Sequence, residues 1–550
     1  MAGILKSEAS DSFIKAVQQV EDRADLCYQG LPLLTFPRNL GSWGILSRII
    51  LQIEETIGQY GYRSQTQTAV TYNLGRGGAQ ALAWVKNLGA PPTANRREFS
   101  ITPALLQFST SALWTAVGYE AFTTSFPLWH KDVLRAEVLQ NGGVRFGSED
   151  EPYLRVRAYL QGLRPAGDRP VAVDLGNDLE PAVKKTIQNI VENARGGQFS
   201  FTYPIPTRLC RQLFDRYYEA SASQFRRDDA LVLGNYTLGI FRKFYSALIA
   251  ICSVHENACF VRAQLKKAYP ANSAVMILTR EDWIRFLSKI SGLSKTDVSE
   301  ILADLMFGAT KTLDLYVHPF VSLDAKPELI GIVPHFPLKS RADENILRVC
   351  SYLRPKLYDA ITSVKEDEMR KDLKAQAYSG FRIRGPRSLP DDLPDVDLVI
   401  EDTLSSTVVI AEMKWLRKTI RTVEQIQQRD LFLRGIEQMR QIKTFLQSNP
   451  GFLAERGDLT ADLNKFQNVH YVVVPRDYFV WAEQSKDKIP VIDYEPFTRA
   501  LSRETTLAQA MTQLLTLDWL PSKGRDFEIK FEPATANGAV VETEVIYARY

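Results

Sequence analysis

The feature that most constrains the fold is a regular alternation of helical and strand-like segments in the last third of the chain. The strand-like segments are short runs rich in Val and Ile, and the helical ones carry apolar residues at helical spacing. In order, the segments are a helix at 364–376, strands at 381–384, 394–402 and 407–415, a helix at 422–447 and a strand at 469–475. This order predicts an α/β unit in which helices flank a small mixed sheet.

The strands 394–402 (PDVDLVIED) and 407–415 (TVVIAEMKW) are expected to pair as an antiparallel hairpin, because only the polar turn TLSS separates them. Asp397 lies between apolar neighbours in the first strand. Glu412 and Lys414 are two residues apart in the second and therefore project from one face. Burying unpaired charge is costly, so such residues in an apolar strand are expected to be paired or used.

These three side chains have the chemistry of a metal-dependent phosphodiesterase. Two carboxylates bind a hard divalent cation through oxygen, and a nearby Lys orients a water molecule and offsets charge on the scissile phosphate. The alternative is a surface hairpin on which Glu412 and Lys414 form an ordinary ion pair, which contributes little to stability.

The sequence here resembles the PD-(D/E)xK, or restriction-endonuclease-like, nucleases. The matching residues are Pro394 with Asp395 or Asp397, followed by Glu412 and Lys414, and the resemblance covers about residues 361–476. It implies a restriction-endonuclease-like core with Asp397, Glu412 and Lys414 as catalytic residues. It also implies Mg²⁺ or Mn²⁺ as the cofactor, held by Asp397 and Glu412. Asp395 remains open as the metal ligand, although the apolar neighbours of Asp397 favour the latter.

The resemblance extends to both helices that flank the strands. Glu368 lies on the helix before them, where many members of the family carry a further acidic residue of the metal site. Gln438 lies on the helix after them, as in subfamilies whose helical Gln lines the active site. The resemblance therefore implies Glu368 as a third metal ligand and Gln438 as a fourth catalytic residue.

Basic residues are concentrated around this motif. Residues 414–443 contain eight Lys and Arg against three Asp and Glu, although the whole chain has a formal net charge of only +3. A cationic rim of this kind positions a phosphate backbone without recognising its sequence. The residues expected to bind nucleic acid are Arg382, Arg384, Arg417, Lys418 and Arg421.

The chain is too long for one core, and we expect a mixed region at 1–150, an α-rich region at 151–340 and the nuclease domain at 341–550. The nuclease domain is expected to be closed by a helix around 507–517 and a C-terminal hairpin of 527–533 with 540–550.

Two motifs in the N-terminal part have a structural interpretation. The helical pair at 279–306 has a helix-turn-helix outline, but its second helix is acidic and would repel phosphate. The glycine cluster at 73–78 lacks the pattern of a phosphate-binding loop and is expected to form a turn and a helix start. Without such a loop, an ATP-dependent motor is excluded.

The composition is ordinary for a soluble protein. We find no apolar run that indicates a membrane span and no secretion signal, so a cytoplasmic location without a membrane partner is expected. The five scattered cysteines indicate a reducing compartment. Cys252, His255 and Cys259 lack the fourth ligand of a structural zinc site.

We therefore expect an enzyme: a metal-dependent nuclease that hydrolyses nucleic acid, with DNA favoured over RNA. The large N-terminal region is assigned to substrate guidance, to a protein partner or to a homo-oligomer. Such an architecture resembles enzymes of prokaryotic defence against phage or foreign DNA. The alternative is a catalytically silent nucleic-acid-binding or scaffold subunit that retains the nuclease fold.

Overall fold

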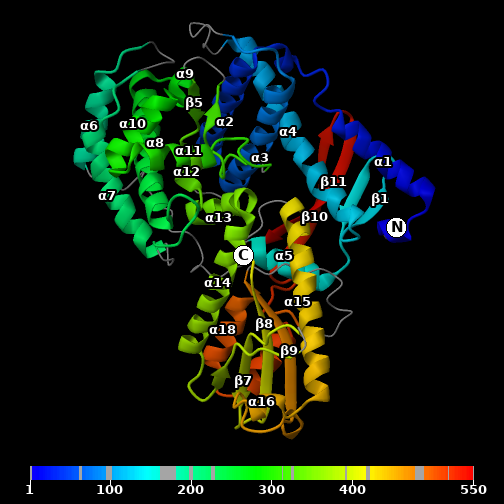
Figure 1. Ribbon diagram of the computed structural model, residues 1–550. Coiled ribbons are helices and arrows are strands. Elements are labelled where there is room, and N and C mark those ends of the chain that lie inside the picture. Colours follow the sequence, from blue (N-terminus) through cyan, green and yellow to red (C-terminus); the bar gives the residue numbers. More distant parts are fainter. Residues whose placement is uncertain are drawn as a thin grey trace.

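The computed structural model shows a mixed α/β protein with 58% helix, three small sheets and a helix-rich N-terminal half (Figure 1). The sequence predicts this class. The structure describes residues 3–60, 65–93, 102–161, 181–196, 202–224, 229–311, 314–323, 328–390, 393–416, 422–476, 489–517 and 519–548.

Helices form most of the N-terminal half (Figure 1). They are α1 (Asp11–Asp25), α2 (Arg38–Tyr60), α3 (Gln65–Leu88), α4 (Pro103–His130), α5 (Glu151–Gln161), α6 (Pro181–Glu192), α7 (Thr207–Gln224), α8 (Leu238–Lys266), α9 (Ala271–Ala274), α10 (Arg280–Ser291), α11 (Lys295–Asp304) and α12 (His335–Lys339). Two 3-10 helices, Lys6–Glu8 and Pro32–Thr35, accompany them.

The predicted helical pair at 279–306 is confirmed as α10 and α11. The Thr279 hydroxyl accepts a hydrogen bond from the backbone N–H of Asp282 at 3.0 Å, and the Ser294 hydroxyl accepts one from that of Asp297 at 3.1 Å. Gly292 ends α10 in the left-handed conformation, with φ of 74°. The local capping signals therefore specify both helices.

The glycine cluster at 73–78 does not form a turn, so this prediction is wrong. It lies inside α3, at the point where α3 meets its neighbours. A Cβ atom at Gly77 would lie 2.4 Å from Val117 of α4, and one at Gly78 would lie 2.4 Å from Ile49 of α2. The glycines therefore allow close helix packing, which no local sequence rule reveals.

The C-terminal hairpin is confirmed, but it does not close the C-terminal sheet as expected. Its strands β10 (Phe527–Ala536) and β11 (Ala539–Ala548) join β1 (Arg135–Val138) and β2 (Val144–Gly147) in the order β1-β2-β11-β10. Strand β11 runs parallel to β2, and the hairpin packs against α4 (Figure 1). A hairpin forms from residues close in sequence, whereas tertiary packing determines which strand pairs with its free edge.

A small antiparallel sheet lies among the N-terminal helices. It has the order β3-β5-β4 and consists of β3 (Met276–Thr279), β4 (Val321–Ser322) and β5 (Leu329–Ile332).

The third sheet, called the C-terminal sheet below, has the strand order β6-β7-β8-β9. Its strands are β6 (Arg382–Arg384), β7 (Leu398–Asp402), β8 (Thr407–Trp415) and β9 (Asn468–Arg476). The predicted hairpin is confirmed, because β7 and β8 pair antiparallel; β9 is parallel to β8. The helices of this part are α13 (Ala342–Leu353), α14 (Pro355–Gln376), α15 (Thr422–Ser448), α16 (Phe452–Glu455), α18 (Tyr494–Arg503), α19 (Leu507–Leu515) and the 3-10 helix Leu463–Lys465.

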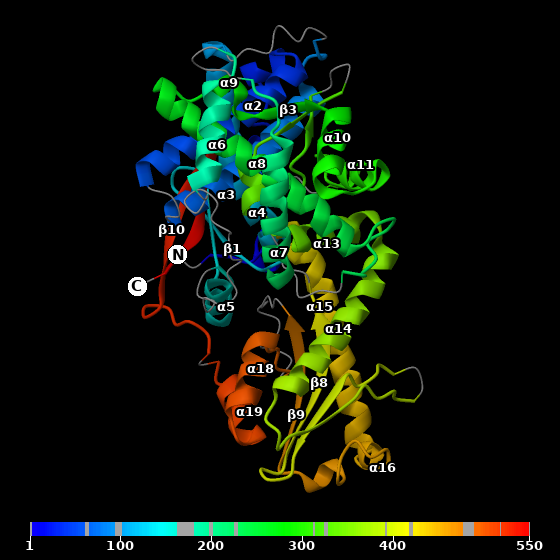
Figure 2. The same cartoon turned by 90° about the vertical axis from the view of Figure 1, so that its left-hand side faces the viewer.

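Helices cover both faces of the C-terminal sheet (Figure 2). On one face, Ile400 and Val409 share a core with residues of α14, α18 and α19. On the other, Val408 and Ile410 pack with Phe432 and Ile436 of α15. Alternate residues of each strand thus enter different cores, which explains why these strands are almost continuously apolar.

Helix α8 is long and apolar enough to cross a membrane, which our reading of the sequence did not note. Of its most apolar window, 72% is buried inside the protein. The core helix of a globular protein has the same properties, so this helix is weak evidence for a membrane span.

Candidate functional site

The structure brings Asp397, Glu412 and Lys414 together at one end of the C-terminal sheet. Leu398 of β7 pairs with Ala411 of β8, so Asp397, directly before β7, lies next to Glu412. Glu412 is within hydrogen-bonding reach of the Asp397 carboxyl. Glu412 and Lys414 share the face of the sheet that packs against α15. The predicted convergence of the three groups is therefore present.

Glu412 is the most deeply buried group of the site. Its side chain is 3% exposed, and its Oε1 atom lies 2.5 Å from the Nζ atom of Lys414. Burial and the neighbouring Asp397 raise the pKa of Glu412 to about 8, although Lys414 acts in the opposite direction. Burial lowers the pKa of Lys414, but its carboxylate neighbours, Glu412 foremost and then Glu366 and Asp397, together raise it. The ion pair is thus internal, unlike that of the surface-hairpin alternative.

Asp397 is held at both carboxylate oxygens. Its Oδ2 accepts a hydrogen bond from the backbone N–H of Met413 at 2.8 Å, and its Oδ1 accepts one from Nη1 of Arg370 at 3.1 Å. Burial raises the pKa of this carboxyl, against the effects of the Met413 amide and of the cations Lys414 and Arg370. Asp395 is exposed, so the structure favours Asp397 as the inward-facing carboxylate.

A glycine permits the chain to pass close behind Asp397. Gly385 has a φ of 114°, and a Cβ atom there would lie 2.5 Å from the carbonyl oxygen of Asp397. Any side chain at this position would clash with that carbonyl and displace Asp397. In the sequence, Gly385 lies shortly before the hairpin, but only the tertiary fold shows what this glycine contacts.

The acidic residue that α14 contributes is Glu366, not Glu368. Glu366 Oε1 accepts a hydrogen bond from the backbone N–H of Trp415 at 3.1 Å. Burial raises the pKa of Glu366, and its neighbours include Lys414 and Asp397. Glu368 is 40% exposed and pairs with Lys365 at 2.6 Å. Glu366 and Glu368 lie on the same helix, but two residues along a helix turn a side chain by about 200°.

Arg370 was also missed by the sequence analysis. It lies one turn after Glu366 on α14, and its side chain is 12% exposed. Glu366 and Arg370 are four residues apart and therefore share one face of the helix, and this spacing could have identified them from the sequence. This signal was not distinctive, because α14 carries many charged residues.

Helix α15 contributes a close backbone approach to the site. A Cβ atom at Gly435 would lie 3.5 Å from Cε of Lys414, so a small residue there leaves room for the lysine side chain. Gln438 is partly buried on the next turn of α15, and no described contact joins its side chain to the three motif residues. Its catalytic role remains a prediction.

The predicted cationic rim is only partly described. Arg382 lies opposite Glu401, toward the other end of β7 from Asp397, and donates a hydrogen bond to the carbonyl of Gly457 at 2.8 Å. The register of β6 therefore places Arg382 away from the site. Arg384 pairs with Val399 nearer to the site and is exposed. Arg417, Lys418 and Arg421 lie outside the described residues.

The donor atoms of the site suit a hard divalent cation, although they are not arranged as a finished metal centre. Burial raises the pKa of both carboxyls, and Asp397 raises that of Glu412 further; a divalent cation would relieve this cost of ionisation. Among the described residues, no group of three or more His, Cys, Asp or Glu side chains is placed to hold a metal ion. In the arrangement present, Lys414 and Arg370 hold the two carboxylates.

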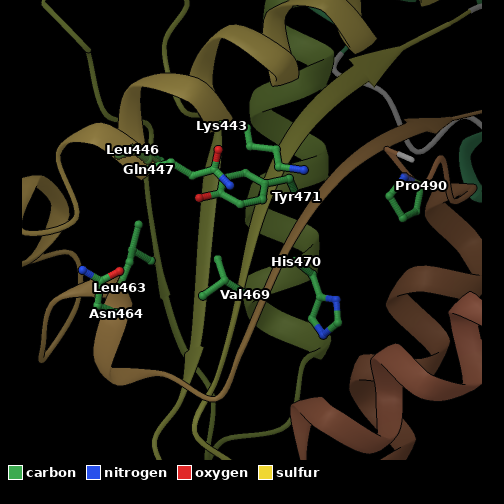
Figure 3. A pocket seen from close by; sticks show the side chains of 9 residues that line it. All are labelled: Lys443, Leu446, Gln447, Leu463, Asn464, Val469, His470, Tyr471 and Pro490. Atoms are coloured by element: carbon green, nitrogen blue, oxygen red, sulfur yellow. The ribbon is translucent and has the colours of Figure 1, made fainter. Parts of the chain in front are cut away.

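A cavity of about 380 Å³ lies beside β9 (Figure 3). Tyr471, one of its lining residues, pairs with Ile410 of β8, two residues before Glu412. The lining residues are Lys443, Leu446, Gln447, Leu463, Asn464, Val469, His470, Tyr471 and Pro490. This lining contains no carboxylate, so the cavity and the acidic site are separate features.

Comparison of this chain with protein-family models, with curated proteins and with solved structures finds no match.

Proposed function

We propose that this protein is a divalent-metal-dependent nuclease whose C-terminal sheet and flanking helices form a restriction-endonuclease-like core. The observation that carries the proposal is the meeting of Asp397, Glu412 and Lys414 on adjacent strands. DNA is the proposed substrate, and the cytoplasm is the proposed location. The N-terminal half is proposed to guide the substrate or to bind a partner.

Each residue has a role in hydrolysis of a phosphodiester bond. Asp397 and Glu412 would hold Mg²⁺ or Mn²⁺, and Glu366 adds negative charge beside Asp397 and Lys414. When bound, the cation supplies positive charge to the phosphate and lowers the pKa of a coordinated water molecule. Lys414 orients the attacking water and offsets the charge that develops as the new P–O bond forms and the ester P–O bond breaks. The attacking water loses a proton to solvent as the new bond forms, and the leaving oxygen takes up a proton from solvent.

Incubation of the purified protein with circular and linear DNA tests this proposal. We expect cleavage with Mg²⁺ or Mn²⁺, loss of cleavage with EDTA, and no cleavage by Lys414→Ala. Lys414 is 22% exposed and supplies charge rather than core volume, so the variant should keep its fold. Lys374→Ala, at an exposed position of α14, is the matched control and should cut normally. DNA binding without cleavage would support the silent-subunit alternative instead.

The two acidic residues of the PDVD segment should behave differently. Asp397→Asn should remove most of the activity and weaken divalent-ion binding, because an amide oxygen carries no net charge and holds a hard cation poorly. Asp395→Asn should change stability by at most about 1 kcal/mol, because Asp395 is exposed. Calorimetric titration of both variants with Mn²⁺ measures the difference. The opposite ranking would move the metal ligand to Asp395.

A further inference from the structure

Arg370 is a cation that the motif does not require, yet it contacts one of the motif carboxylates. Its Nη1 atom lies 3.1 Å from Oδ1 of Asp397, and its Nη2 atom binds Asp367 on the same helix. The other oxygen of Asp397 already accepts a hydrogen bond from the Met413 amide, whose position β8 fixes. Oδ1 is therefore bound by a side chain that can move, whereas Oδ2 is bound by a backbone amide.

The carboxylate of Glu412 is likewise paired with a cation of the chain. Its Oε1 lies 2.5 Å from Nζ of Lys414. Each of the two carboxylates proposed to hold a divalent cation is therefore paired with one of the chain's own cations. Together, Arg370 and Lys414 supply two positive charges, the charge of one divalent ion. This pairing accounts for a site that is rich in carboxylates but not arranged as a metal centre.

We propose that Arg370 is a positioning residue that acts as a latch: it holds Asp397 in the metal-free protein and competes with the divalent cation for Oδ1. The inference rests on the proposed function, because it takes Asp397 as a metal ligand. A cation that binds Oδ1 displaces the guanidinium. The released group, 12% exposed beside the site, is then free to bind a phosphate oxygen, for which its forked donors are well suited. Metal binding and nucleic-acid binding are thereby coupled.

The test is calorimetric titration of Mn²⁺ into the full-length protein without nucleic acid. Gln is the replacement of choice, because its amide is polar and suits a helix but carries no charge. Arg370→Gln should bind Mn²⁺ about tenfold more tightly than the wild type, since the competing charge is gone. Arg370→Lys keeps the charge and should bind like the wild type.

Lys371→Gln is the matched control for the loss of one positive charge. Lys371 is the next residue of α14 and is exposed, so this variant should leave Mn²⁺ affinity unchanged. Circular dichroism and thermal unfolding of each variant verify the fold. Equal or weaker Mn²⁺ binding by a folded Arg370→Gln would overturn the latch while leaving the nuclease proposal intact. A wild type that neither binds Mn²⁺ nor cleaves nucleic acid would overturn both.

Discussion

Glu412→Gln should reduce metal-dependent cleavage by about three orders of magnitude, because it removes one of the two charged oxygen ligands while preserving side-chain shape. The measurement is the single-turnover rate on DNA at saturating Mg²⁺. Glu437→Gln makes the same chemical change on α15 at a side chain that is 52% exposed and paired with Arg440. This control should cut at the wild-type rate. A Glu412→Gln variant as fast as its control would remove Glu412 from the site.

The same substitution should stabilise the metal-free fold as pH rises. In the unfolded chain, Glu412 has its ordinary pKa of 4.5, whereas in the fold the pKa is about 8. The contribution of this group to stability is therefore fully present below pH 4.5 and is lost as pH rises through about 8. Gln stays neutral throughout. The free energy of unfolding of Glu412→Gln should therefore increase relative to that of the wild type across this window, by the order of a few kcal/mol.

Urea unfolding in EDTA near both ends of this window measures the effect. Glu437→Gln, at a side chain that is 52% exposed, is the control for the same chemical change. A Glu412→Gln variant whose advantage over the wild type is the same at both ends would contradict the raised pKa of Glu412.

Glu424→Ala should destabilise the protein by about 3 to 5 kcal/mol, the usual cost of leaving a buried charge without its partner. Glu424, near the start of α15, lies 2.9 Å from Nε of Arg348 on α13, and both side chains are 2% exposed. Asn345 accepts a second hydrogen bond from Arg348 at 2.9 Å. This network joins α15, which borders the candidate site, to α13. Thermal and urea unfolding measure the loss.

The double variant Arg348→Met with Glu424→Leu separates loss of charge pairing from loss of packing. Replacing both charges by apolar groups of similar volume should recover most of the stability, because neither member of the buried pair is left without its partner. The exposed pair Arg440–Glu437 is the matched comparison, and Glu437→Ala should cost at most about 1 kcal/mol. A Glu424→Ala variant as stable as Glu437→Ala would show that the buried pair contributes nothing to the junction.

The sequence by itself determined the local elements and the pairing of the motif. The short runs rich in Val and Ile and the polar turn TLSS between them specified the hairpin, and the hairpin register is what brings Asp397 beside Glu412. The capping residues Thr279 and Ser294 likewise specified the starts of two helices. These features depend on contacts between residues close in sequence, so their causes can be read from the chain directly.

Only the tertiary structure decided which residues of distant elements complete the site. The rotation of α14 about its axis, set by packing on the sheet, presents Glu366 and Arg370 to the site, whereas Glu368 is 40% exposed and pairs with Lys365 of the same helix. Tertiary packing likewise determines the pairing of β11 with β2 and the burial of the α3 glycines against α2 and α4. Such choices depend on how surfaces far apart in the sequence fit together, and local periodicity carries no information about that fit.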